Sequence, residues 1–191
     1  MNYNFFVPTR VLFGAGCLNQ LHDQKMPGKK AMVVISNGKS VRENGALSRT
    51  LDQLKAAGVD SVIFDKVEAN PLKSTVEAGG KFAKSNGCDF VVALGGGSVM
   101  DAAKLCSVLK GASYTVRDLL KDPSLAKKQV KTVMIPTTCG TGSEATCNAI
   151  VAIPEEESKK GIVNDSMIPD YVLLDSQMIR KLPKAIVAAT G

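Results

Sequence analysis

The sequence contains no tryptophan, and only 5% of its 191 residues are aromatic. Its formal net charge of +6 comes from basic residues in scattered pairs, with acidic residues spread among them. Proteins that bind nucleic acids favour a basic stripe with interleaved aromatic residues on which bases stack. Because no such stripe is present, we expect no nucleic-acid partner. A small anionic ligand on an ordinary charged surface explains the basic excess better.

Several other features are missing from the sequence. The five cysteines form neither a C-x-x-C pair nor a short disulfide framework, which is typical of a cytoplasmic protein with reduced thiols. No apolar run approaches the ~20 residues that cross a bilayer. The first six residues lack the basic and apolar regions of a secretory signal. We therefore expect a cytoplasmic protein with no membrane partner.

Histidine is almost absent as well. The one histidine, His22, lies far from the other motifs, in what reads as a polar helix start. A catalytic metal needs about three protein ligands, and no set of Asp, Glu, His and Cys has the spacing of such a site. We expect no metal ligand and no catalytic residue within these 191 residues.

The composition that remains, 45% hydrophobic and 22% charged, is ordinary for a globular chain that buries its own core. Short apolar runs alternate with helical patterns. Strands are predicted at 31–36, 61–64, 90–94, 132–136 and 171–175, and helices at 47–57, 74–85 and 99–110. This rhythm is typical of βαβ units, so the fold class is α/β, with a mostly parallel sheet flanked by helices.

The two ends of the sequence differ from this pattern. Residues 5–13 surround Pro8 and favour an edge strand or a hairpin. After residue 149 another apolar run reaches Pro154 and is followed by an acidic loop at 155–157. Near the end, Pro183 is well placed to begin a new helix.

A glycine-rich turn, Gly95-Gly96-Gly97-Ser98, separates a predicted buried strand from a predicted helix. Glycine lets a ligand approach the backbone closely, and the N-terminus of the helix presents free amides and positive potential to a phosphate. Ser98 can add a hydroxyl, and Asp101 can cap the first turn. The alternative is a tight turn with no ligand. The spacing matches neither G-x-G-x-x-G nor the Walker pattern.

A second polar cluster, at 136–144, follows the next predicted strand. Its four hydroxyls and two glycines could surround a phosphate, a ribose or a carboxamide. A Ser/Thr-rich turn that satisfies its own backbone explains the cluster equally well. However, two such loops at the carboxyl ends of neighbouring strands would form one shared crevice, which favours a ligand.

Taken in series, several stretches resemble the iron-containing (group III) alcohol dehydrogenases. Each is weakly specific alone, but together they follow the family's order and spacing through the whole chain. The stretches are Val7–Gly14, Asn70-Pro71, Gly95–Lys104, Pro136–Glu144 and Leu182–Gly191. The resemblance implies a Rossmann-like domain that binds NAD or NADP over residues 1–181. Residues 182–191 would then be the first turns of a helical domain that carries Fe²⁺ or Zn²⁺.

The resemblance also implies a set of cofactor-binding residues. Gly96, Gly97 and Ser98 should hold the pyrophosphate, and Asn70 should lie near the adenosine end. Lys160 should reach the nicotinamide ribose, with Lys159 as the alternative. The residues expected along the phosphate, ribose and nicotinamide side are Thr137, Thr138, Thr141, Thr146 and Asn148.

The turn at 36–40 departs from the NAD-selective members of this family, which usually place an Asp here to bind the adenosine ribose. Instead, Gly38, Lys39 and Ser40 could bind a 2′-phosphate through N–H, ammonium and hydroxyl groups. This turn resembles that of the NADP-using butanol and aldehyde reductases of the family. We therefore expect NADP to be accepted at least as well as NAD.

The resemblance implies reversible hydride transfer between NAD(P) and a primary alcohol or diol, or the corresponding aldehyde. In the family an Asp directly after the pair that here is Thr190-Gly191, and three later histidines, bind the metal. The expectation is thus a nucleotide-binding domain that is inactive alone. An apolar face would then favour a homo-oligomer such as a dimer. Alternatives are a non-catalytic NAD(P)-binding module, a glycerol-dehydrogenase-like relative and a dehydroquinate synthase, which the run Gly97–Lys104 argues against.

Overall fold

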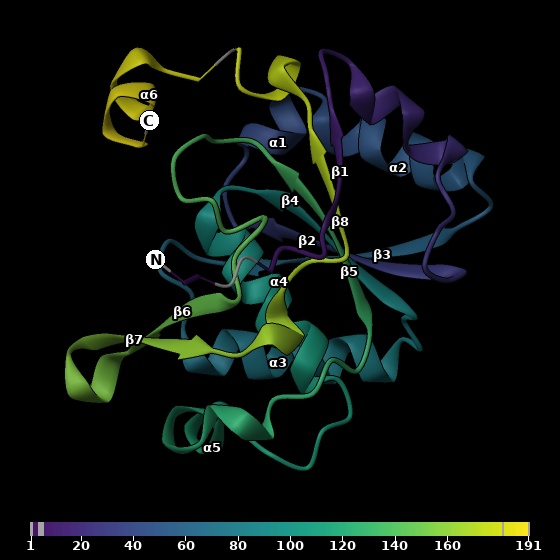
Figure 1. The fold of residues 1–191 in the computed structure, drawn as a ribbon. Helices are drawn as coiled ribbons and strands as arrows, with labels where there is room; N and C mark the ends of the chain where they lie inside the picture. The colour runs from purple at the N-terminus through teal and green to yellow at the C-terminus, as the bar shows by residue number, and fades with distance from the viewer. Residues whose placement is uncertain (1, 4–5, 181, 191) are drawn as a thin grey trace.

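A six-stranded sheet forms the centre of the protein (Figure 1). The computed structural model describes residues 2–3, 6–180 and 182–190. The strand order is β1-β8-β5-β4-β2-β3, and all neighbouring strands are parallel. The strands are β1 (Arg10–Phe13), β2 (Lys30–Ser36), β3 (Asp60–Val67), β4 (Phe90–Gly95), β5 (Lys131–Pro136) and β8 (Tyr171–Leu174). The predicted α/β class with a mostly parallel sheet is confirmed.

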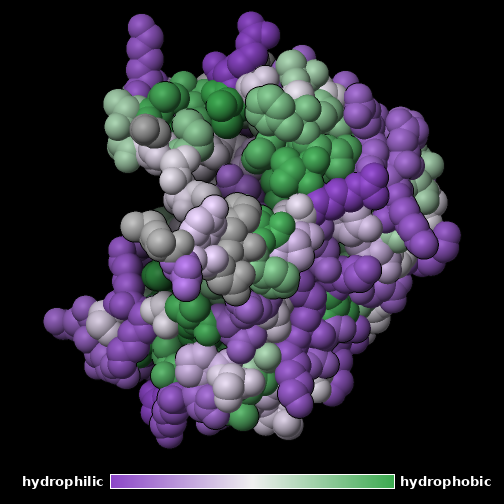
Figure 2. Space-filling model, in the orientation of Figure 1, coloured by the Kyte–Doolittle hydropathy of each residue, from purple (hydrophilic) through white to green (hydrophobic). Residues whose placement is uncertain are grey.

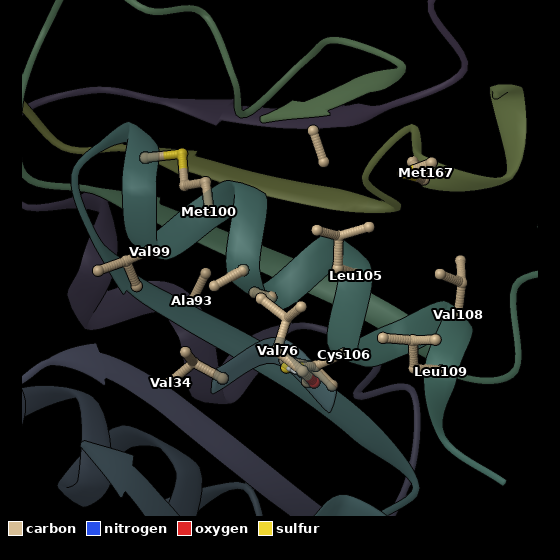
Figure 3. Close-up of a cluster of buried hydrophobic side chains, with 14 of the residues drawn as sticks. Val34, Val76, Ala93, Val99, Met100, Leu105, Cys106, Val108, Leu109 and Met167 are labelled. Carbon is tan, nitrogen blue, oxygen red and sulfur yellow. Dashed lines mark hydrogen bonds between the residues drawn. The ribbon is translucent and has the colours of Figure 1, made fainter. Parts of the chain in front are cut away.

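Helices cover both faces of this sheet. One face carries α1 (Ser40–Glu43), α2 (Ala46–Ala56) and a 3-10 helix at Cys17–Asp23, and the other carries α3 (Lys73–Ser85), α4 (Gly97–Leu109) and α5 (Val116–Lys121). Side chains alternate between the faces along each strand, so Val33 packs under α2 while Val34 packs under α4. Figure 3 shows the second of these cores, with Val34 and Ala93 from the sheet and Leu105 and Cys106 from α4.

Helix α4 is buried along nearly its whole length. Most of its side chains are apolar, and from Val99 to Leu109 every residue except Asp101 is buried, as is typical of a helix enclosed by other elements. Helix α3 packs closely against it because Gly79 and Gly80 have no side chains at the contact. A Cβ at Gly79 would overlap the Cys106 sulfur, and one at Gly80 would lie 2.9 Å from the Leu109 Cβ.

A separate hairpin extends from the body of the molecule. The apolar run after residue 149 is β6 (Asn148–Ile153), which pairs antiparallel with β7 (Ser158–Val163) outside the main sheet. The acidic loop forms the connection, with Glu157 in the left-handed region at φ 47°. Strand β6 packs on α4 through Ala149 and Val151, which are fully buried.

The N-terminal segment forms an edge strand and no hairpin over its described residues. Strand β1 covers only 10–13 and pairs with β8; residues 4 and 5 lie outside the described part. After Pro183 the chain forms α6 (Lys184–Thr190), as the proline predicts, and no described side chain of α6 is buried. None of the helices in the described ranges is long and apolar enough to cross a membrane.

Candidate functional site

The strand order creates a crevice between β2 and β4. From β2 the chain passes to α1 and α2 on one face, whereas from β4 it passes to α4 on the opposite face. The two connections therefore diverge at the carboxyl end of the sheet, which is where open α/β sheets bind ligands. A cleft of about 770 Å³ opens there, lined by the loops that follow β2, β3, β4 and β5 and by residues of β6, β7 and α6. In Figure 2 the surface is indented below α6.

Glycines form the floor of the cleft at the N-terminus of α4. Gly96 is the N-cap, and among the described residues no side chain caps this end of the helix. A Cβ on Gly96 would lie 3.0 Å from the Thr138 Oγ1, and one on Gly97 would lie 2.8 Å from the Thr141 Cγ2. The first turn of α4 thus faces the cleft with bare backbone. The helix dipole and these amides make it suited to a phosphate group.

The loop after β3 forms the side of the cleft next to this turn. Asn70 adopts a left-handed conformation at φ 59°, and its N–H donates to the Ser98 Oγ at 3.2 Å. The Glu68 carboxylate accepts from the Leu72 N–H at 3.1 Å and from the Thr75 hydroxyl at 2.8 Å. These bonds hold the loop in place beside Ser98.

The predicted cap by Asp101 is wrong. Its carboxylate accepts instead from the Ser143 hydroxyl and, at 3.0 Å, from the Ile150 N–H. The side chain therefore leaves the first turn of its own helix uncapped and binds the segment that follows β5.

Lys104, one turn further along α4, has a fully buried side chain. Its ammonium donates to the Ser143 Oγ at 3.0 Å, to the Thr146 Oγ1 at 3.1 Å and to the Asn148 carbonyl at 2.9 Å. The nearest carboxylate oxygen, on Asp101, is 3.8 Å away. Burial lowers the pKa of Lys104 from 10.5 to about 8, and nearby Asp101 only partly opposes this effect.

Most of the residues selected from the sequence lie together in the cleft. Those that line it are Gly38, Ser40, Asn70, Gly96, Gly97, Ser98, Thr137, Thr138, Thr141, Thr146 and Asn148. Lys39 and Lys160 are not part of the lining; Lys160 pairs with Glu156 of the acidic turn. Lys159 lines the cleft, because successive residues of a strand point to opposite faces. Of the two lysines named from the sequence, Lys159 lines the cleft and Lys160 does not.

Sequence reasoning missed part of this site. Glu68 lines the cleft, and Lys104 lies behind its wall. Lys104 could have been recognised, because a lysine between Ala103 and Leu105 stands among mostly apolar residues of a predicted helix. Glu68 gave no comparable signal, since a carboxylate after a strand is usually exposed.

The ionisable side chains of the described residues form no metal site. No group of three or more His, Cys, Asp and Glu side chains within these ranges is placed to hold a metal ion. The Nδ1 of His22 lies 2.7 Å from the Gln53 Oε1 in a contact exposed to solvent on the α2 face of the sheet.

Comparison with known proteins agrees with the motifs and the fold. The model of the family "Iron-containing alcohol dehydrogenase" matches residues 8–176. The chain belongs to the iron-containing alcohol dehydrogenase family. It is 32% identical over 190 residues to an NADPH-dependent butanol dehydrogenase of Clostridium saccharobutylicum, an alignment that covers 98% of this chain and 48% of the relative.

Solved structures of iron-containing alcohol dehydrogenases and of similar enzymes have the same fold. The NADH-dependent butanol dehydrogenase A of Thermotoga maritima superposes with a TM-score of 0.92 at 25% identity, over 99% of this chain and 48% of that one. A sulfoacetaldehyde reductase of Bifidobacterium kashiwanohense, solved in complex with NAD⁺, has a TM-score of 0.88 at 28% identity, over 100% and 50%. The chain thus spans about half the length of the relatives it matches.

Proposed function

We propose that the cleft binds NADP or NAD, and that the chain is the nucleotide-binding domain of an alcohol dehydrogenase or aldehyde reductase. The observation that carries the proposal is the bare, uncapped N-terminus of α4 at the point where the connections of β2 and β4 diverge. A diphosphate fits there because glycine removes the side chains and the helix supplies amides and positive potential.

Each part of the lining then has a role in the proposal. Gly96, Gly97 and Ser98 hold the diphosphate, and Asn70, bonded to Ser98, lies toward the adenosine end. Lys159 takes the place of Lys160 at the nicotinamide ribose. The residues proposed for the phosphate, ribose and nicotinamide side are Thr137, Thr138, Thr141, Thr146 and Asn148.

We further propose that NADP binds at least as tightly as NAD. The turn at 36–40 contains no carboxylate, and Gly38 and Ser40 line the cleft with Lys39 between them. The nearest acid of this end of the lining, Glu68, already accepts two hydrogen bonds. The turn itself would therefore offer a 2′-phosphate hydrogen-bond donors and no carboxylate of its own.

The proposed reaction of the whole enzyme is reversible hydride transfer between a primary alcohol or diol and the nicotinamide ring. The bound nicotinamide supplies the hydride chemistry, and the residues of the cleft bind and orient it. Because no metal cluster occurs in the described residues, no metal-dependent step is assigned to them. We propose that residues 1–181 form the nucleotide domain and that α6 begins a helical one, since α6 buries none of its described side chains.

Two further proposals concern assembly and location. Exposed apolar side chains on β1 and α6, such as Phe13 and Ile186, favour a homo-oligomer, for example a dimer. A cytoplasmic location fits the five cysteines, none of which is paired in the structure, since disulfides are rare in that compartment.

Titration calorimetry with NADP and NAD, each with and without Fe²⁺ or Zn²⁺, tests the nucleotide site. We expect saturable heat from the coenzymes and none from the metals. Gly97→Ala should weaken coenzyme binding about tenfold or more, because the new methyl group displaces Thr141 and fills the approach to the amides of α4.

Gly161→Ala is the matched control. It makes the same substitution on β7, where the new Cβ makes only an ordinary contact with Ile150 at 3.4 Å, and it should bind coenzyme like the wild type. If neither coenzyme binds at millimolar concentration, or if both variants lose affinity equally, the proposed site is wrong.

A further inference from the structure

The buried ammonium of Lys104 serves no purpose in the nucleotide site as described above. It does not line the cleft, yet it is placed directly behind one wall of it. Burying a charge is costly unless hydrogen bonds compensate, and an apolar side chain of similar length would avoid the cost. A buried charge with this free-energy cost suggests that the ammonium has a specific role.

All three hydrogen bonds of the ammonium go to one short segment. Ser143, Thr146 and Asn148 supply the acceptors, and each of these residues lines the cleft. Their hydroxyl and carbonyl oxygens converge on Nζ from the loop that connects β5 to β6. The ammonium therefore fixes the path of this loop at three points.

Asp101 makes two further hydrogen bonds to the same segment. Its two carboxylate oxygens accept from the Ser143 hydroxyl and the Ile150 N–H. Asp101 and Lys104 are one turn apart on α4, the helix whose first turn carries Gly97 and Ser98. One rigid helix thus holds both the proposed diphosphate site and the 143–150 wall.

We propose that Lys104 is a positioning residue, which with Asp101 locks the 143–150 wall at a fixed distance from the diphosphate site so that the nicotinamide half of the coenzyme is held correctly. The inference rests on the proposed nucleotide site. Lys104 acts through Ser143, Thr146 and Asn148 and does not touch the coenzyme. Its loss therefore affects a whole dinucleotide, while a ligand that ends at the diphosphate is spared.

Protonation of Lys104 gives a second readout. Burial lowers its pKa to about 8, and the ionisable groups that bear on it are Asp101 on α4 and Cys147 and Glu144 on the loop. The ammonium has three donors for its three acceptors, whereas the neutral amine has only two. One of the three hydrogen bonds from Lys104 to the 143–150 wall is therefore lost as the pH rises through the pKa of Lys104.

The experiment compares the affinities of the wild type, Lys104→Met and Lys128→Met for NADP and for ADP. Methionine keeps an unbranched apolar chain as far as Cε and removes the ammonium with its donors. Lys104→Met should bind NADP about tenfold or more weakly and ADP within about twofold of the wild type, because charged hydrogen bonds to the wall are lost. Lys128, the control, bonds to Asp170 and Ile168 at the opposite end of β5 from the cleft, so its variant should keep the wild-type ratio.

The same titrations over pH 7 to 9.5 test the role without depending on the folding of a variant. Wild-type affinity for NADP should fall as the pH rises above about 8, while affinity for ADP stays constant. A folded Lys104→Met should show no such fall. Equal losses for NADP and ADP, or a wild-type profile that is flat for NADP, would overturn the inference. If the wild type binds neither ligand, the proposed nucleotide site itself fails.

Discussion

The turn after β2 contains no carboxylate, and its geometry allows one to be introduced. A Cβ on Gly38 would meet only the Ser36 Oγ, at 3.5 Å, and Gly38 does not need a positive φ. We therefore expect Gly38→Asp to fold normally. Its carboxylate should repel a 2′-phosphate and accept from a ribose hydroxyl, lowering NADP affinity by about tenfold or more while NAD affinity is kept or improved.

Separate Kd measurements for the two coenzymes check this prediction. Lys39→Ala provides a comparison, since it removes a positive charge without adding a negative one and should weaken NADP modestly. A Gly38→Asp variant whose two Kd values change in parallel would show that this turn does not contact the 2′ position.

Individual residues were predicted with uneven success. The glycines and hydroxyls selected from the sequence do line the cleft, because they follow strands whose carboxyl ends meet at one edge of a parallel sheet. Asp101 and Lys104 were misjudged or missed, because their partners are about forty residues away in sequence and only the fold brings them together. Which of Lys159 and Lys160 lines the cleft depends on the face to which each residue of β7 points. The sequence does not reveal that face.

At the scale of elements, the contact of α3 with α4 depends on Gly79. Alanine has a better helix propensity than glycine by about 1 kcal/mol, so Gly79→Ala would stabilise an isolated helix. Here the new methyl group would overlap the buried Cys106 sulfur. Overpacking typically costs about 1–3 kcal/mol, and we expect it to exceed the propensity gain.

Urea unfolding of Gly79→Ala and of Lys81→Ala, an exposed control on the same helix, measures this difference. The control should stay within about 0.5 kcal/mol of the wild type. A Gly79→Ala variant that is as stable as the wild type, or more so, would mean that the two helices can separate freely.

The sequence predicted the main strands and long helices well, because apolar runs and a 3.6-residue period persist over each of them. Strand β7 and helix α5 were not predicted. In β7 only Ile162 is buried, so the strand has no alternating pattern to detect. Helix α5 is six residues long, too short for a helical period to be visible.

For the molecule as a whole, exposed apolar surface is the feature with the clearest consequence. Figure 2 shows apolar residues gathered along the upper part of the view, over α6 and the end of β1. On the edge strand, Phe13 is 81% exposed and Val11 is 49% exposed. An edge strand with such side chains favours association. We therefore expect the protein to self-associate as its concentration rises.

Sedimentation velocity over a range of concentrations tests this expectation. Phe13→Ser should shift the protein toward monomer, whereas Val163→Ser, which removes an exposed apolar side chain from the distant hairpin, should leave the distribution unchanged. If the wild type stays monomeric at all concentrations, or if the two substitutions have equal effects, the apolar surface over β1 and α6 is not the site of association.

The hairpin of β6 and β7 contributes one lysine to the cleft out of two identical neighbours. Because a displacement by one position turns every side chain to the other side, such a slip would exchange Lys159 for Lys160 without altering the composition. An insertion or deletion of two residues in β7 would therefore leave each side chain on the same face of the hairpin. A change of one residue would reverse the faces unless the loop at 155–157 changed its length to compensate. Alignments that match the two lysines by letter alone would place the wrong one in the cleft.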